Sequence, residues 1–427
     1  MESEGNRAPR APWWIPPVFG RTPDLEPRHL QLLGLVSLAL LFENYDFSLL
    51  TAALPFIAES LALEEAELGN FTALIRLGAL PAFLVIPVAD RLGRRRVFLV
   101  SIVILSLGTV LTGFAQTANQ FLVIQIVTRT FMLTSSAVAF VMISEELPAA
   151  HRGWGIGILG ALASMGHGLS ALLFAAVDYL PFGWRALYVV GLAPVFFLPR
   201  FRRGIQETQR FVQASPGEDG GGFAGYLAPI QLLVGRFPGR AVGLALLGLL
   251  TAAATSSVYQ FTAQFLLTRR GWAPGQYSLL LLTGGAIGIM GNVLAGRLSD
   301  AFGRRRVGVA FLIGFPVLAW GFLNGVGPFL VVSWTLMTLS LTGSATVSRA
   351  FATELFPTAF RGTATGGLTL METLGAALGL VLVSAGMSFG TDLVTMLVAL
   401  SFLAPIAAVT ILSFPETGGR ELEAISE

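Results

Sequence analysis

The stretch DRLGRRR at residues 90–96 is repeated 210 residues later, within GRLSDAFGRRR at residues 296–306. A second pattern, Glu-x-x-Pro-x-x-x-Arg-Gly, begins at Glu145 and again at Glu354, an offset of 209 residues. Two unrelated patterns at almost the same offset indicate an internal duplication. The sequence therefore predicts two structurally related halves.

The chain of 427 residues is too apolar to be a soluble protein of this size. Hydrophobic residues make up 54% of it and charged residues 12%, against about 25% charged residues in soluble proteins. A membrane span needs about 20 apolar residues, because the backbone in lipid must hydrogen-bond within its own segment. Charge-poor runs predict twelve helices, near residues 32–57, 69–89, 97–116, 120–144, 154–177, 183–199, 241–267, 275–296, 307–324, 328–352, 362–387 and 393–413.

We therefore predict an all-α membrane protein in which twelve transmembrane helices form two pseudo-symmetric six-helix bundles. The bundles are expected at residues 30–200 and 240–413, with a hydrophilic linker at residues 201–239. Residues 1–29 and 414–427 are predicted to be cytoplasmic tails. The first tail is polar and proline-rich, unlike a cleaved signal, and is expected to be disordered.

The basic residues indicate how the chain is oriented in the membrane. All 27 are arginine, and 21 of them fall in the two tails and in the loops that follow the even-numbered predicted helices. Cytoplasmic loops are enriched in basic residues, so both termini and the linker are predicted to be cytoplasmic. The first loop on the opposite side is acidic, with Glu64, Glu65 and Glu67.

Both repeated patterns resemble those of the major facilitator superfamily, in which Gly-x-x-x-Asp-Arg-x-Gly-Arg-Arg joins the second and third helices of each half. The second copy departs from that pattern at Ala301, and the first has Ile86 in place of the leading glycine. The Glu-x-x-Pro-x-x-x-Arg-Gly pattern is similar to the sugar porter and organic ion branches. So is PETGGRELE at residues 415–423, with Gly418 where sugar porters have lysine. The resemblance implies a secondary transporter that works by alternating access.

The charged loops at the cytoplasmic face suit a gate. Carboxylates near helix N-termini and arginines, with glycines that permit tight turns, would form ion pairs between the halves that hold this face closed. If the arginines only set the topology, neither the carboxylates nor their fixed spacing is explained. The predicted gate residues are Asp90, Arg91, Gly93, Arg94, Glu145, Arg152, Asp300, Gly303, Arg304, Glu354 and Arg361.

Ionisable residues also occur inside the predicted helices, where an unpaired charge costs about 3 kcal/mol or more. Glu43 and Asp46 share one face of the first helix, while Arg76 and Arg129 lie in the second and fourth helices. Counted at 1.5 Å per residue from the cytoplasmic ends, Asp46, Arg76 and Arg129 lie at depths of roughly 21, 20 and 22 Å. Opposite charges at one depth in one half predict a functional cluster.

Proton-coupled sugar porters have an aspartate in a Tyr-Asp context of the first helix, beside an arginine of the fourth. Asp46, which follows Tyr45, resembles that aspartate, and Arg129 resembles the arginine, although it lies only 16 residues before Glu145. Burial disfavours a charged carboxylate, whereas a nearby arginine favours it. We therefore predict that Asp46 carries a proton that Arg129 expels; a static ion pair is the alternative.

Arg76 adds positive charge to this cluster. Two arginines balance Glu43 and Asp46 when both acids are ionised, so protonation of one acid leaves a positive pocket that favours an anionic substrate. The alternative is that Arg76 only pairs with Glu43.

Polar residues in the second half supply candidates for the opposite wall of a cavity. Gln260 and Gln264 lie four residues apart on one face of the seventh helix, where sugar porters have adjacent glutamines that bind hydroxyls. Asn292 lies in the eighth predicted helix, and Glu372 in the eleventh is the only acid well inside the second half. We predict that these residues bind substrate or, for Glu372, a proton or cation.

These patterns favour proton-coupled symport of a small polar organic solute, with an organic carboxylate preferred. A sugar porter and an uncoupled facilitator are alternatives of the same class, and a non-transporting membrane sensor is an alternative of another class. No enzyme is expected, and an ATP-driven pump would need Gly-x-x-x-x-Gly-Lys in a chain that has no lysine. We expect no cofactor, metal or nucleic acid. The expected protein is a monomer in the plasma or inner membrane, with substrate, protons and the lipid bilayer as its partners.

Overall fold

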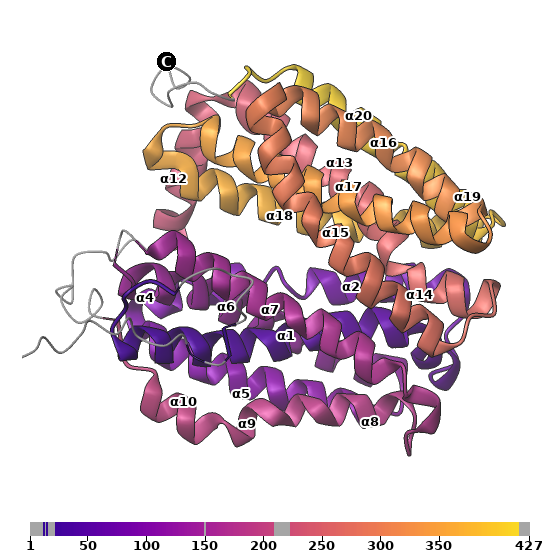
Figure 1. Cartoon of the computed structure of the whole chain (residues 1–427), viewed down its shortest axis with the longest axis horizontal. Helices are drawn as coiled ribbons and strands as arrows, with labels where there is room; N and C mark the ends of the chain where they lie inside the picture. Colours follow the sequence, from indigo (N-terminus) through magenta and orange to yellow (C-terminus); the bar gives the residue numbers. More distant parts are fainter. Residues whose placement is uncertain (1–11, 13, 16–21, 149–150, 209–222, 418–427) are drawn as a thin grey trace, which may run out of the picture.

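The computed structural model describes residues 12, 14–15, 22–148, 151–208 and 223–417. These residues form helices joined by short loops, as expected for the predicted all-α membrane fold. Figure 1 shows the helices in two groups, with those of the first half of the chain below and most of those of the second half above.

The first group begins with the long helix α1 and ends with several short helices. Its members are α1 (Pro27–Ser60), η2 (Glu65–Glu67), α2 (Leu68–Leu77), α3 (Ala82–Val85), α4 (Val88–Leu92), α5 (Arg94–Gly113), α6 (Ala118–Glu146), α7 (Arg152–Phe174), η3 (Val177–Tyr179), α8 (Trp184–Val189), η4 (Val190–Leu192), α9 (Ala193–Phe196) and α10 (Leu198–Gly204).

The second group follows the segment at residues 209–222, which lies outside the described residues. Its members are α12 (Phe223–Arg236), α13 (Pro238–Gln260), α14 (Thr262–Gln264), η5 (Phe265–Arg269), α15 (Pro274–Phe302), α16 (Arg304–Asn324), α17 (Gly327–Glu354), η6 (Thr358–Phe360), α18 (Arg361–Ser388), α19 (Leu393–Ser401) and α20 (Leu403–Leu412).

Eleven helical segments among the described residues are long and apolar enough to cross a membrane. The twelfth expected span, near residues 183–199, is instead divided into α8, η4, α9 and α10. Pro194 and Pro199 lie in the first turns of α9 and α10, and proline lacks the N–H that would continue a helix from the preceding turn. The short helices nevertheless run one after another along α5 (Figure 1).

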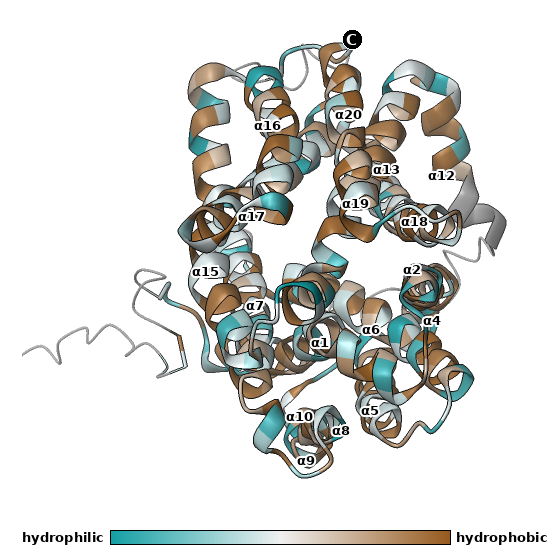
Figure 2. Cartoon of the chain, turned by 90° about the vertical axis from the view of Figure 1, so that its right-hand side faces the viewer, coloured by the Kyte–Doolittle hydropathy of each residue, from teal (hydrophilic) through white to brown (hydrophobic). Residues whose placement is uncertain are grey.

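The sides of both groups expose large apolar side chains, and hydrophobic stretches run along most helices in Figure 2. Leu111, Val123, Val317 and Val409 are 54, 62, 68 and 63% exposed. Apolar surface on this scale is costly in water but not in lipid tails. The surface is therefore that of a protein surrounded by a bilayer.

The two groups pack closely at the end that holds the acidic η2 segment. A Cβ added to Gly69 of α2 would collide with the carbonyl oxygen of Leu380 in α18, and the Asn70 N–H donates to Oγ of Ser384 at 2.9 Å. Toward the arginine-rich end, a Cβ added to Gly362 of α18 would meet nothing within 4 Å. The halves therefore pack most tightly at the acidic end.

Two segments expected to be a linker and a disordered tail contain packed residues. The linker includes helix α12, which contacts α13 and α18 and buries Leu233. In the tail, the ring of Trp14 lies beside Gly34 of α1, and Ile15 is buried. The expectation of disorder is therefore wrong for Trp14 and Ile15; residues 1–11, 13 and 16–21 lie outside the described residues.

Candidate functional site

A cavity of about 420 Å³ lies between the two groups of helices. Its wall comes from α1, α2 and α6 on one side and from α13, α17 and α18 on the other. Because the two walls belong to different halves, any relative movement of the halves changes the shape of the cavity. Its charged lining residues are Glu43, Arg76, Arg129, Arg349 and Glu372.

Glu43 joins two helices of the first half. Its side chain extends from α1, and the Ser135 hydroxyl of α6 donates a hydrogen bond of 2.6 Å to its Oε2 atom. Glu43 is 5% exposed, so this hydrogen bond is shielded from water. The carboxyl group therefore has a fixed position in the cavity wall.

Two arginines of the first half lie over one aromatic ring. The guanidinium carbon of Arg129 is 4.6 Å from the centre of the Phe47 ring, and that of Arg76 is 5.7 Å from it. Both distances permit cation–π attraction. Among the described residues, no carboxylate oxygen lies within 4.0 Å of a guanidinium nitrogen of either arginine, so neither forms an ion pair. Their positive charges therefore face the cavity without a directly paired acid.

Asp46 lies behind the cavity wall and is 1% exposed. In the described part of the chain, neither carboxylate oxygen accepts a hydrogen bond of normal geometry, although the Thr109 side chain lies near enough to stabilise the charge. Arg129 is close enough to act on Asp46 electrostatically, but not close enough for an ion pair. The structure thus brings these two residues into one buried cluster without the direct pair that the resemblance implies.

Arg76 does not pair with Glu43, which was one of the two expectations for it. Its Nη2 atom instead donates a hydrogen bond of 3.1 Å to Oε1 of Gln260, and the Thr51 hydroxyl lies 3.5 Å from the same oxygen. Gln260 belongs to α13, so Arg76 and Thr51 connect the two halves. Gln260 closes one end of the cavity rather than lining its open interior.

Gln264 and Asn292 are not among the residues that line the cavity. The Gln264 amide donates to Oε1 of Glu65 at 3.4 Å, so this residue lies at the acidic end between the halves. Asn292 is exposed, and its Oδ1 accepts a hydrogen bond of 2.8 Å from the Thr346 hydroxyl. Neither residue belongs to the cavity wall in this structure, and their predicted role in substrate binding stays a prediction.

An ion pair at the acidic end connects the two halves. The Arg269 guanidinium lies 2.6 Å from Oε2 of Glu65 and 3.6 Å from Oδ1 of Asp392. Glu65 belongs to the first half, and Arg269 and Asp392 belong to the second. This cluster lies beyond the Arg76–Gln260 hydrogen bond, so the closed end of the cavity has two layers of polar contacts.

The arginine-rich end holds two ion-pair clusters that repeat each other. In the first half, Arg94 lies 3.0 Å from Asp90 and 3.3 Å from Glu145. In the second half, Arg304 lies 2.7 Å from Asp300 and 3.3 Å from Glu354. Before each arginine the chain turns at a glycine: Gly93 has φ 96° and Gly303 has φ 93°, a conformation that favours glycine.

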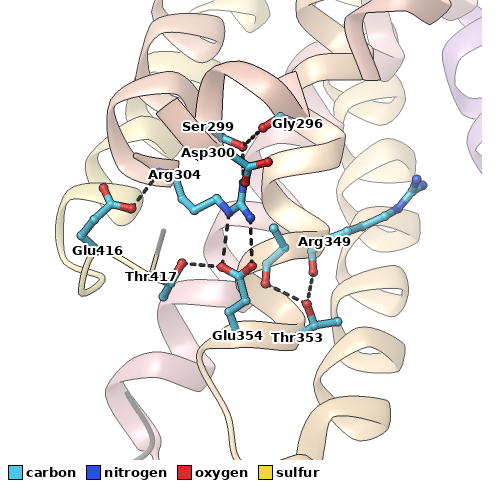
Figure 3. A network of polar contacts seen from close by, with 10 residues as sticks. Gly296, Ser299, Asp300, Arg304, Arg349, Thr353, Glu354, Glu416 and Thr417 are labelled. Carbon is cyan, nitrogen blue, oxygen red and sulfur yellow. Dashed lines mark hydrogen bonds and ion pairs between the residues drawn. The ribbon is translucent and has the colours of Figure 1, made fainter. Parts of the chain in front are cut away.

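Each cluster includes a glutamate that was not among the predicted gate residues, although Glu416 lies in the PETGGRELE pattern. Figure 3 shows Glu416 beside Arg304 in the second half, where its carboxylate accepts the backbone N–H groups of Arg304 and Arg305 at 2.7 and 3.2 Å. In the first half, Glu207 accepts the N–H of Arg95 at 3.2 Å. The dipeptides Glu207-Thr208 and Glu416-Thr417 are also 209 residues apart, a third signal of the duplication.

Ion pairs between the halves are not found among the described residues of the arginine-rich end, so the predicted latch stays a prediction for another state of the protein. Among the described residues, the ion pairs of Arg94 and Arg304 stay within their own halves. Arg152 and Arg361 have no ion pair in the described ranges, and Arg91 is exposed. Ion pairs that join the halves are found at the acidic end, so the clusters at the arginine-rich end stabilise the loops of each half.

The sequence profile of the Major Facilitator Superfamily matches residues 36–213 and 244–424. The chain belongs to the major facilitator superfamily. The two matched stretches correspond to the two groups of helices in Figure 1, and the predicted resemblance is confirmed.

Curated relatives of this superfamily member are transporters. It is 26% identical to a gallate transporter of Pseudomonas putida, over 90% of this chain and 91% of that protein. It is also 26% identical to the niacin transporter NiaP of Acinetobacter baylyi, over 93% and 96% of the two chains. This chain is therefore a transporter, not an enzyme, and a multi-pass integral membrane protein with a small-molecule substrate.

Solved structures of the superfamily share the fold. A bacterial homologue of the human lysosomal transporter Spinster aligns with a TM-score of 0.77 at 18% identity, covering 91% of this chain and 97% of that one. A D-xylose–proton symporter aligns with a TM-score of 0.73 at 16% identity, covering 92% and 99%. At these identities the likeness supports the architecture alone.

Arg349 is a cavity residue for which the sequence predicted no role in this transporter. It extends from α17 and lines the cavity together with Glu372 of α18, which feels its charge. In Figure 3 the Arg349 side chain points away from the cluster of Arg304 and Glu354. Its position within a predicted span was the available signal, because arginine inside a membrane span is usually functional.

Proposed function

We propose that this superfamily member is a proton-coupled symporter of a small organic carboxylate and works by alternating access. This proposal rests on the positive charge of the cavity wall. The wall has three arginines, Arg76, Arg129 and Arg349, but two acids, Glu43 and Glu372. An excess of arginine in a partly dehydrated site favours an anionic group, and a guanidinium can bind a carboxylate with two parallel hydrogen bonds.

The same wall supports a carboxylate that carries a ring. Phe47 contributes to the wall directly beneath the two arginines, so a bound aromatic acid would meet cations and an aromatic face together. The volume of about 420 Å³ lies in the range of about 300–1,000 Å³ for small-molecule sites. Relatives are named as transporters of gallate, niacin and 3-(3-hydroxyphenyl)propionate, which supports the same class.

Coupling to protons would depend on Asp46 and Arg129. A buried carboxyl group without a hydrogen-bond partner is more stable as the neutral acid than as the carboxylate, unless a cation lies near it. When Arg129 binds the substrate carboxylate, it would stabilise the charge of Asp46 less. Substrate and proton would therefore bind together and leave together, which is symport.

The direction of opening follows from the predicted orientation. If the arginine-rich end faces the cytoplasm, the contacts of Arg76 with Gln260 and of Glu65 with Arg269 close the outer side of the cavity. The structure would then be an inward-facing state. Transport would require these contacts to break while others form at the cytoplasmic end.

Uptake into proteoliposomes tests this function. The purified chain is assayed with an aromatic acid, an aliphatic carboxylate and a neutral sugar, with and without an inward proton gradient. We expect the gradient to drive accumulation of the aromatic acid above its external concentration, and the sugar to remain at equilibrium. Asp46→Asn should abolish accumulation while still permitting exchange of labelled for unlabelled substrate.

Glu372→Gln is the matched control, because it neutralises an acid on the opposite wall of the same cavity. It should leave coupling through Asp46 intact, so that uphill uptake persists while the affinity for the substrate changes. Accumulation by Asp46→Asn would overturn the assignment of the proton carrier. Uptake that ignores the gradient would indicate a facilitator, and uptake of the sugar alone would indicate a sugar porter. Binding without any transport would indicate a sensor.

A further inference from the structure

A second hollow, separate from the central cavity, lies on the side of the first half. Its volume is about 510 Å³, and it lies between the start of α5 and α10, which are neighbours in Figure 1. Three arginines form one end of this hollow: Arg95, Arg96 and Arg202. The remaining lining is apolar and comes from Leu99, Val100, Val103, Ile104 and Leu198.

The lining is ordered along α5, with the charge at one end. Residues 95, 96, 99, 100, 103 and 104 follow the spacing of one helical face, and at 1.5 Å per residue they extend over about 14 Å. The arginines lie at the level of the loop clusters, while Val100 and Ile104 lie deeper along the span. A ligand that fits must therefore be anionic at one end and apolar along its length.

The side chains of Arg95, Arg96 and Arg202 are available to bind the anionic end of such a ligand. The Arg95 guanidinium donates one hydrogen bond of 2.6 Å to the backbone carbonyl of Arg202. The backbone N–H of Arg95 donates to the Glu207 carboxylate. In the described part of the chain, none of the three guanidinium groups forms an ion pair. The carboxylate of Glu207 lies close by, but it accepts the backbone N–H groups of Arg95 and Thr208.

The second half lacks this combination, although it repeats the fold. Arg305 donates 2.6 Å to the carbonyl of Leu412, just as Arg95 does to that of Arg202. The position of Arg202 is thus taken by a leucine, and those of Val100 and Ile104 are taken by Ala310 and Gly314. The duplication alone therefore does not require the three arginines and the large apolar side chains.

We propose that the hollow between α5 and α10 binds an anionic phospholipid. The phosphate would bind Arg96 and Arg202, and one acyl chain would lie along Leu99, Val103 and Ile104. Charge complementarity selects this occupant, since basic pockets between helices near the membrane surface attract anionic head groups. The apolar part of the hollow lies on the exposed side of α5, where Val100 is 47% exposed, so an acyl chain could enter it from the surrounding bilayer.

Native mass spectrometry of the full chain in detergent tests the proposal. Delipidated protein is titrated with phosphatidylglycerol or with phosphatidylcholine of the same acyl chains. We expect one phosphatidylglycerol to bind more tightly than any phosphatidylcholine. Affinity should fall roughly fivefold for Arg96→Gln and by a similar further factor when Arg202→Gln is added. Both side chains are exposed, so the variants should fold, which elution as a single species checks.

Arg306→Gln is the matched control, because Arg306 holds the position in α16 that Arg96 holds in α5. Its affinity for phosphatidylglycerol should equal that of the unmodified chain. An equal loss with Arg306→Gln would show a general effect of net charge and overturn the site. Equal binding of the two lipids would also overturn it. Displacement of the lipid by millimolar glycerol 3-phosphate would indicate a phosphate site and not a lipid site.

Discussion

The guanidinium of Arg76 donates a hydrogen bond of 3.1 Å to Oε1 of Gln260, and this bond joins α2 of the first half to α13 of the second. Arg76 also lies over Phe47 in the cavity wall. The same side chain therefore contacts both the candidate substrate site and the other half of the molecule. A substrate anion that attracts Arg76 would compete with Gln260 for it.

Gln260→Leu should open the acidic end of the protein more often. Leucine keeps the volume of the side chain but cannot accept the hydrogen bond, and a bond to a charged group contributes about 1.5–3 kcal/mol. The chain has no cysteine, so Ser384→Cys, fully buried between the halves, reports opening through its reaction with a thiol reagent. We expect the labelling rate to rise roughly tenfold in the Gln260→Leu background.

Gln125→Leu is the control for that measurement. Gln125 is also buried, and its amide donates to the Thr112 hydroxyl at 3.1 Å, but both residues belong to the first half. Its loss should leave the labelling rate of Ser384→Cys unchanged. Equal rates in the Gln260→Leu and Gln125→Leu backgrounds would rule out a role for Arg76 and Gln260 in closing this end.

Glu65→Gln should open the same end, but by less. The pair of Glu65 and Arg269 is partly exposed, with side-chain exposures of 27 and 45%, and exposed ion pairs contribute about 0.2–1 kcal/mol. In this variant Arg269 would still have a partner in the Asp392 carboxylate, which lies 3.6 Å from it. The labelling rate of Ser384→Cys should rise less than about fivefold, and 0.5 M salt should reduce the difference. A rise as large as that of Gln260→Leu would contradict this ranking.

Glu416→Ala should destabilise the second half. The Glu416 carboxylate accepts two backbone N–H groups at the start of α16, where a helix has unsatisfied donors. Loss of such a cap costs about 1 kcal/mol. Glu207→Ala removes the corresponding carboxylate from the N–H of Arg95 in the first half and should cost less. Apparent melting temperatures in detergent compare the two variants; a lower value for Glu207→Ala would contradict the expectation.

In the repeated loops, the sequence correctly predicted the turns at Gly93 and Gly303, but it placed the ion pairs between the halves, not within each half. The approach of Arg94 to Asp90 and of Arg304 to Asp300 follows from a spacing of four residues, and the glycine before each arginine marks the turn. The sequence could not show in which half the second carboxylate partner of each arginine lies. Glu145 and Glu354 are far from the arginines in sequence, and their packing within each half depends on the three-dimensional fold.

The candidate site was predicted less completely, for reasons of local geometry. Gln260 and Gln264 were expected on one face of a continuous helix, but α13 ends at Gln260 and α14 begins at Thr262. No proline marks this break in the sequence. Arg349 lies close to the cytoplasmic end of its predicted span, so its contribution to the cavity became apparent from the position of α17 opposite α6.

Arg349→Gln should weaken the binding of an anionic substrate without uncoupling transport. Arg349 lines the cavity on the wall opposite Arg129, so its positive charge attracts a carboxylate, while Asp46 lies in the other half. We expect the KM for an aromatic acid to rise roughly tenfold in proteoliposomes, with the proton gradient still driving accumulation. Because Arg349 is exposed, high salt should screen its charge and bring the KM values of the variant and the unmodified chain together.

Arg297→Gln is the control. It removes an exposed arginine of the same half that does not line the cavity, and the KM of this variant should equal that of the unmodified chain. An equal rise with Arg297→Gln would mean that the general surface charge, not Arg349, attracts the substrate.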